Sequence, residues 1–254
     1  MFEPLVTAMR TLTSIPIPGT DSDHPASALP FFPLVGGFIG AVFYVVAGAS
    51  ALLLPEESLI GGLFVMLAAV FITGALHIDG LADVADAFGA GGNRERIFAL
   101  LKDSRHGTFG VTAITCSIAG RILLSAWYID HRYSAVLLSA AIFSRTLQAW
   151  GCSLVPYAHP GGGGTSVFFS GAYRIPLGVT TCISLGICGL ILRPLTLAVI
   201  LLSSLVPVLL FFNYSRKKIG GLTGDGLGAA NEIAELSFLL CGVVCFTVFR
   251  NLGL

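Results

Sequence analysis

The chain has 254 residues, of which 55% are hydrophobic and only 11% are charged, and its formal net charge is zero. Soluble domains carry charge on about 25% of their residues, so this composition, with a mean hydropathy of +0.87, excludes a water-facing surface over most of the chain. The lack of a basic excess argues against nucleic-acid binding. We therefore expect one integral membrane domain spanning residues 1–254, with an all-α fold.

Seven apolar stretches follow a more polar N-terminal segment. Residues 1–30 predict a cytoplasmic or interfacial segment, in which residues 5–17 lie along the membrane surface. A helix needs about 20 apolar residues to cross a bilayer. The stretches that approach this length are residues 31–54, 58–76, 108–129, 133–154, 175–192, 195–212 and 236–254. The sequence predicts a polytopic helical bundle of about seven transmembrane helices.

Basic residues lie mostly on one side of this topology. If the segment 77–107 is cytoplasmic, nine lysines and arginines lie inside, and only Arg132, Arg193 and Arg250 lie outside. Positive residues favour the cytoplasmic side. We expect a cytoplasmic N-terminus, and any chemistry that the protein performs is expected on the cytoplasmic side.

Three aspartates follow the second apolar stretch in HIDGLADVADAFG, residues 77–89. If the second helix continues through Asp86, then Asp83 lies about 40° to one side of Asp79 and Asp86 about 20° to the other. Carboxylates so close repel one another unless a cation lies among them, and all-oxygen sites favour Mg²⁺. The motif predicts a magnesium site formed by these three aspartates, and a solvated acidic helix is the alternative. His77, on the opposite face, is expected to be interfacial or hydrogen-bonded.

A basic segment follows this motif. A glycine-rich break and a good N-cap residue, Asn93, predict a short helix that ends near Lys102. Lys102, Ser104 and Arg105 are predicted to bind substrate phosphate, with Asp103 as a further metal or hydroxyl contact. The alternative is an ordinary basic loop beside the membrane.

A second acidic cluster lies in GLTGDGLGAANEIAE, residues 221–235, where a glycine-rich turn leads into a helix expected to begin near Gly228. Asp225 and Glu232 are the predicted catalytic groups, either as ligands of a second metal ion or as a base. A purely structural role is the alternative, because Glu232 and Glu235 near a helix N-terminus suit the helix dipole.

Two arginines, Arg121 and Arg145, lie inside predicted spans. A central arginine costs about 2.5–3.5 kcal/mol on membrane-insertion scales, so such residues normally face a cavity or an acidic partner. We expect Arg145 to contact a buried phosphate or carboxylate, and we count it among the candidate substrate-binding residues.

Three motifs together resemble a known family. HIDGLADVADAFGAGG, LLKDSRHGTFGV and GLTGDGLGAANEIAE, in this order and in a seven-span frame, are similar to the cobalamin synthase family of adenosylcobinamide-GDP ribazoletransferases, also called cobalamin (5′-phosphate) synthases. The similarity runs from about residue 30 to residue 236. The chain departs from the family's usual residues at Ala87, His106 and Gly226, and none of these changes removes a carboxylate.

The resemblance implies a magnesium-dependent phosphotransferase that joins α-ribazole, or its 5′-phosphate, to adenosylcobinamide-GDP. GMP is released and adenosylcobalamin, or its 5′-phosphate, is formed. The implied partners are these small molecules and membrane lipid, with a homo-oligomer or association with other corrinoid-pathway enzymes left open. Breaking a pyrophosphate requires neutralisation of charge on the bridging and leaving oxygens, which fits the acidic and basic motifs.

Two other functions are weighed against this one. A CDP-alcohol phosphotransferase also carries spaced aspartates at a helix end. Its pattern has DG and then AR, followed by GxxxDxxxD, whereas here Asp79-Gly80 is followed by Leu81-Ala82-Asp83. A cation transporter would place its acids near the bilayer midplane, whereas these cluster at predicted helix ends on one side.

Overall fold

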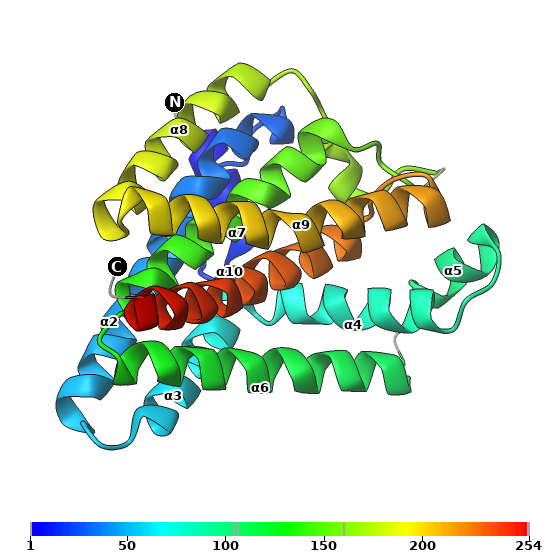
Figure 1. Cartoon of the computed structure of the whole chain (residues 1–254). Coiled ribbons are helices and arrows are strands. Elements are labelled where there is room, and N and C mark those ends of the chain that lie inside the picture. The colour runs from blue at the N-terminus through cyan, green and yellow to red at the C-terminus, as the bar shows by residue number, and fades with distance from the viewer. Residues whose placement is uncertain (1, 104, 106, 160, 253–254) are drawn as a thin grey trace.

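The computed structural model describes residues 2–103, 105, 107–159 and 161–252, and over these residues the protein is helical (Figure 1). This confirms the predicted all-α fold. The helices are α1 (Glu3–Leu12), η1 (Pro25–Phe31), α2 (Phe32–Leu53), α3 (Ser58–Thr73), α4 (Leu76–Gly89), α5 (Arg94–Leu100), α6 (Thr108–Asp130), α7 (Ala135–Leu154), η2 (Gly164–Phe168), α8 (Arg174–Ile191), α9 (Pro194–Ile219) and α10 (Gly224–Leu252).

The protein is an integral membrane protein with five or six candidate spans in the part of the chain that the structure describes. Five helices are long and apolar enough to cross a membrane, and α3 together with α4 makes a sixth if the bent pair is one span. The expected number of about seven is approximately consistent with this finding. Helix α7, the fourth predicted span, is not among the five, and it carries buried polar residues such as Arg145 and Gln148. It packs in the centre of the bundle against α2, α8 and α10, which cover its polar groups.

The second predicted helix does not continue straight through Asp86, and on this point the sequence prediction is wrong. Gly74 and Ala75 adopt left-handed backbone conformations, with φ of +61° and +60°, which end α3. Helix α4 then starts at a bend of 90°. As a result, α4 carries the acidic motif against α6 and α10, and the three helices lie side by side (Figure 1).

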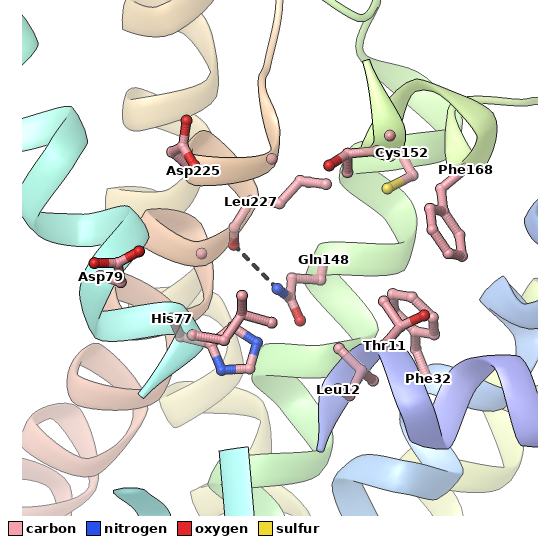
Figure 2. Close-up of a pocket in the computed structure, with 15 residues that line it drawn as sticks. Thr11, Leu12, Phe32, His77, Asp79, Gln148, Cys152, Phe168, Asp225 and Leu227 are labelled. Carbon is pink, nitrogen blue, oxygen red and sulfur yellow. Dashed lines mark hydrogen bonds between the residues drawn. The ribbon is translucent and has the colours of Figure 1, made fainter. Parts of the chain in front are cut away.

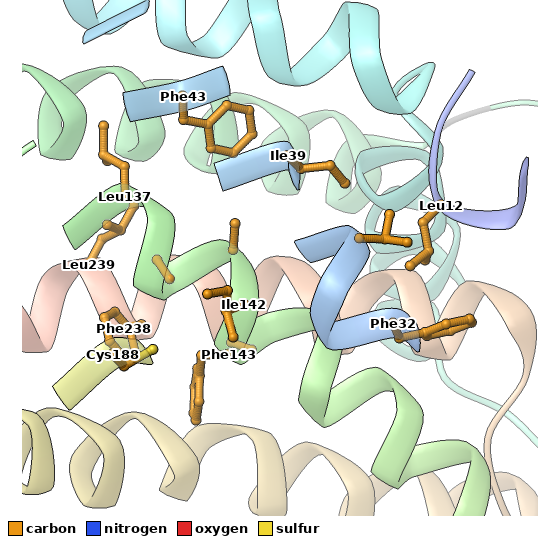
Figure 3. Packing of buried hydrophobic residues seen from close by; sticks show 14 of the residues in the cluster. Leu12, Phe32, Ile39, Phe43, Leu137, Ile142, Phe143, Cys188, Phe238 and Leu239 are labelled. Carbon is orange, nitrogen blue, oxygen red and sulfur yellow. The ribbon is translucent and has the colours of Figure 1, made fainter. Parts of the chain in front are cut away.

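The core that supports this arrangement lies between α2, α7 and α10 (Figure 3). Glycines on α2 allow a close approach, since a Cβ at Gly36 would lie 2.6 Å from the carbonyl oxygen of Ala141, and one at Gly40 would lie 2.6 Å from the Cα of Leu138. Aliphatic and aromatic side chains fill the rest of the interface. Examples are Ile39, Phe43, Leu137, Ile142 and Phe238.

Candidate functional site

Two buried glycines bring α4 and α10 into backbone contact. A Cβ at Gly80 would lie 2.8 Å from the carbonyl oxygen of Asp225 and 3.0 Å from its Cα. A Cβ at Gly228 would lie 3.3 Å from the Cα of His77. Larger side chains would keep the helices apart, so the glycine that follows Asp79 allows the second acidic cluster to lie against the first.

Three carboxylates from these two helices form one acidic group. Asp225, at the start of α10, is half-buried and interacts repulsively with Asp83 and Asp79 of α4. The donor set is composed of oxygen atoms only, which suits Mg²⁺. Among the described residues, no three His, Cys, Asp or Glu side chains converge closely enough to hold a metal ion. The magnesium site predicted at Asp79, Asp83 and Asp86 therefore stays a prediction, and Asp225 lies near the first two of these aspartates.

Asp86 has a different environment from the other two aspartates of its motif. Its carboxylate oxygens accept hydrogen bonds from the backbone N–H of Gly107, at 2.6 Å, and of Gly110, at 2.8 Å. These donors lie at the N-terminus of α6, where backbone N–H groups have no partner within the helix. The structure thus gives Asp86 a capping role that ties α4 to α6, and its role as a metal ligand stays a prediction.

A cavity of about 290 Å³ opens beside the acidic group. Figure 2 shows Asp79 and Asp225 on one side of it and Phe32 and Phe168 on the other, with Gln148 between. The other lining residues come from α1, α4, α7, η2 and α10. They are Thr11, Leu12, Leu76, His77, Cys152, Gly164, Thr165, Gly224, Leu227 and Gly228.

A second cavity, of about 140 Å³, adjoins the first, and both are lined by Thr165, Gly224 and Asp225. Lys102, the first of the predicted phosphate-binding residues, lines this smaller cavity. Tyr157 does so too, and burial together with the negative charge of Asp225 raises the pKa of its hydroxyl. Asp225 therefore lines both the cavity that contains Lys102 and the cavity that contains Phe32 and Phe168.

The segments that form the smaller cavity are held by backbone hydrogen bonds. The N–H of Ala158 donates to the carbonyl of Leu222 at 2.8 Å, and the N–H of Leu222 donates to the carbonyl of Pro156 at 2.9 Å. Asn93 caps α5 as predicted, with its side chain accepting from the N–H of Arg96 at 3.0 Å. The two backbone hydrogen bonds of Leu222 fix the loop after α7 and the segment before α10 relative to each other.

Arg105, a second predicted phosphate-binding residue, lines neither of the two cavities. The exposed Arg105 forms an ion pair with Asp103 at 2.7 Å and, with its backbone N–H, lowers the pKa of that carboxyl to about 2. Ser104 lies outside the described residues. Contact of Arg105 and Ser104 with phosphate stays a prediction.

Arg121 and Arg145 form a buried cluster of ion pairs with two glutamates of α10. Both arginines contact Glu235, and Arg121 also contacts Glu232 at 3.0 Å. This confirms the expected acidic partners and identifies a carboxylate as the contact of Arg145. The cluster joins α6, α7 and α10, and its charged groups do not line the two cavities. Catalysis by Glu232 and substrate binding by Arg145 therefore stay predictions.

Several lining residues were not singled out from the sequence. Phe32 and Phe168 look like ordinary apolar residues of a membrane protein, and Thr165 lies in a glycine-rich loop with no distinctive pattern. Gln148 offered a signal, because a polar amide inside an apolar stretch usually faces protein or a cavity. His77 was placed on the helical face opposite the aspartates, yet it lines the cavity with Asp79.

The fold and the site define a polytopic membrane protein with the acidic and basic groups that phosphotransfer uses. Residues 4–243 match the family model described as Cobalamin-5-phosphate synthase, and the chain belongs to this family. The chain is 34% identical to the adenosylcobinamide-GDP ribazoletransferase of Chlorobium phaeovibrioides, over 98% of its own length and 100% of the relative's. It is 36% identical to the protein of the same name from Prosthecochloris aestuarii, over 92% and 95% of the two chains. No solved structure matches the chain.

Proposed function

We propose that the protein is an adenosylcobinamide-GDP ribazoletransferase. It joins α-ribazole, or α-ribazole 5′-phosphate, to adenosylcobinamide-GDP and releases GMP. The observation that carries the proposal is the juxtaposition of Asp79, Asp83 and Asp225 beside a cavity lined by Lys102. Membership of the family and the names of relatives over nearly the full chain support it.

The proposed reaction breaks the phosphoanhydride bond to GMP and forms a phosphodiester bond to α-ribazole. A ribose hydroxyl of α-ribazole loses its proton, and its oxygen forms a bond to the phosphorus that carries the cobinamide. The bond from this phosphorus to the bridging oxygen breaks, and the electron pair leaves with GMP. Asp225 is the candidate acceptor for the proton, because it lies where the two cavities meet.

The roles of the other side chains follow from their positions. Lys102 binds phosphate oxygens in the smaller cavity as a point charge. Asp79 and Asp83 would hold Mg²⁺, which would neutralise charge on the phosphate oxygens, and Asp225 lies beside them. The same three carboxylates repel one another in its absence, so ion binding and site order are linked.

We further propose that the site faces the cytoplasm of a cell with an inner membrane. The bias of lysine and arginine towards the segments 77–107, 155–174 and 213–235 supports this orientation. GDP-linked and ribazole substrates are polar small molecules, which an opening on that side would admit. A thiol probe placed at Gly91, which has open space around it, should react only from the cytoplasmic side.

The experiment uses the protein in lipid vesicles with adenosylcobinamide-GDP, α-ribazole and Mg²⁺, and measures GMP. GMP release that requires both substrates supports the proposal, and its absence from a folded preparation refutes it. CDP-diacylglycerol with an alcohol, in a parallel arm, tests the phospholipid-synthase alternative through CMP release. Asp83→Asn should abolish GMP release and leave membrane insertion unchanged, and full activity of this variant would remove Asp83 from the site.

A further inference from the structure

The larger cavity has two chemically different ends. Its acidic end is formed by Asp79 and Asp225, and its aromatic end by Phe32 and Phe168, whose ring centroids are 6.1 Å apart at an interplanar angle of 51° (Figure 2). The four segments α2, α4, η2 and α10 thus contribute to one space from distant parts of the sequence. A ligand that fills it must be apolar and flat at one end and must carry a reactive polar group at the other.

Two buried polar atoms lie between these ends. Nε2 of His77 and Oε1 of Gln148 make no hydrogen bond to any residue that the structure describes. The two side chains are 2% and 5% exposed, and they interact with each other, although the two atoms do not reach good hydrogen-bonding geometry. Gln148 is oriented by its Nε2, which donates to the carbonyl of Leu227 at 3.2 Å. Buried polar atoms without a partner are rare, and because both residues line the cavity they are candidates to hydrogen-bond a bound molecule.

The size of the cavity restricts what it can hold. Small-molecule sites usually measure about 300–1,000 Å³, so about 290 Å³ accommodates one small ligand. A nucleoside is of this size, whereas a corrin ring with its side chains is several times larger and cannot enter.

We propose that this cavity is the binding site for the nucleoside acceptor, with its aromatic base between Phe32, Phe168 and Gln148 and its ribose towards Asp79 and Asp225. This inference rests on the proposed function and assigns one of its two substrates to a place. The base packs against the aromatic side chains, and Gln148 and His77 hydrogen-bond the nucleoside. The nucleophilic ribose hydroxyl then lies at the junction with the Lys102 cavity, where the phosphates bind, and the corrinoid stays outside.

The test compares the KM for α-ribazole with the KM for adenosylcobinamide-GDP in two variants. Phe168→Leu keeps an apolar side chain but removes the aromatic ring, and Gln148→Met keeps the volume but removes the amide. Each should raise the KM for α-ribazole, and its equilibrium dissociation constant by calorimetry, about fivefold to fiftyfold. The KM for adenosylcobinamide-GDP should change less than twofold. Phe38→Leu, on the exposed face of α2, is the matched control and should change neither value.

The outcomes separate this inference from the proposed function. An active wild type whose variants bind α-ribazole unchanged, or lose affinity for adenosylcobinamide-GDP instead, overturns the nucleoside site and leaves the activity standing. A wild type that releases no GMP but binds α-ribazole in a Phe168-dependent manner supports the site and refutes the proposed activity. The unchanged KM for the second substrate also reports that each variant is folded.

Discussion

The contact between α4 and α10 at Gly80 is the most sensitive point of the proposed site. In Gly80→Ala, the added Cβ would lie 2.8 Å from the carbonyl oxygen of Asp225, where ordinary contacts begin at 3.4 Å, so the two backbones must separate by about 0.6 Å. Overpacking of this kind costs about 1–3 kcal/mol. A misplacement of about 1 Å in an active site can lower a rate about 10²-fold. We therefore expect kcat for GMP release to fall about tenfold or more, with the unfolding midpoint lowered modestly.

The matched control is Gly48→Ala on α2, where an added Cβ has no neighbour within 4 Å among the described residues. It removes a helical glycine without closing a contact and should stabilise the helix by about 0.5–1 kcal/mol, with activity unchanged. GMP release and thermal unfolding are measured in parallel for both variants. If Gly80→Ala kept wild-type kcat while retaining the fold, the close approach of the two helices would not be what forms the site.

Three further variants test separate parts of the structure. Asp86→Ala removes the cap of α6 and should lower the free energy of unfolding by about 0.5–2 kcal/mol in a denaturant titration, and unchanged stability would contradict the capping role. Glu235→Gln leaves buried arginines short of a partner and should cost about 3–5 kcal/mol in the same titration; a neutral result would show that the cluster is not needed for stability. Lys102→Gln should raise the KM for adenosylcobinamide-GDP without changing thermal stability, because the side chain is exposed; an unchanged KM would remove Lys102 from the phosphate site.

Much of the fold follows from the sequence because hydropathy determines where helices lie in a membrane protein. The same argument predicts α7 at its correct position, but it does not show that the polar residues of that helix are covered by other helices. It also misses the bend at Gly74 and Ala75, because a stretch of apolar residues carries no signal of where the backbone turns. The prediction from sequence makes the apolar stretch and the acidic motif one helix, whereas the structure has two.

Only part of the site could be predicted from the sequence, because the rest depends on how the helices pack against one another. Helical periodicity places Asp79 and Asp83 close together, and the motif around Asp225 is recognisable on its own. Periodicity cannot show that Asp86 turns to the N-terminus of α6, because this depends on how two helices meet. Nor can it show that Phe168 and Gln148 share a cavity with the acids, since η2, α7 and α10 are brought together only by the fold.

The central claim is that aspartates of α4 and α10 act together as one magnesium-dependent phosphotransfer site. The most direct test is GMP release as a function of Mg²⁺ concentration, in vesicles, for the wild type and for Asp225→Asn, with folding checked by thermal unfolding. The account predicts no release after chelation, recovery on adding Mg²⁺, and for the variant a loss of kcat together with a higher Mg²⁺ concentration at half-saturation. Wild-type turnover without Mg²⁺, or an Asp225→Asn curve that coincides with the wild-type curve, would contradict it.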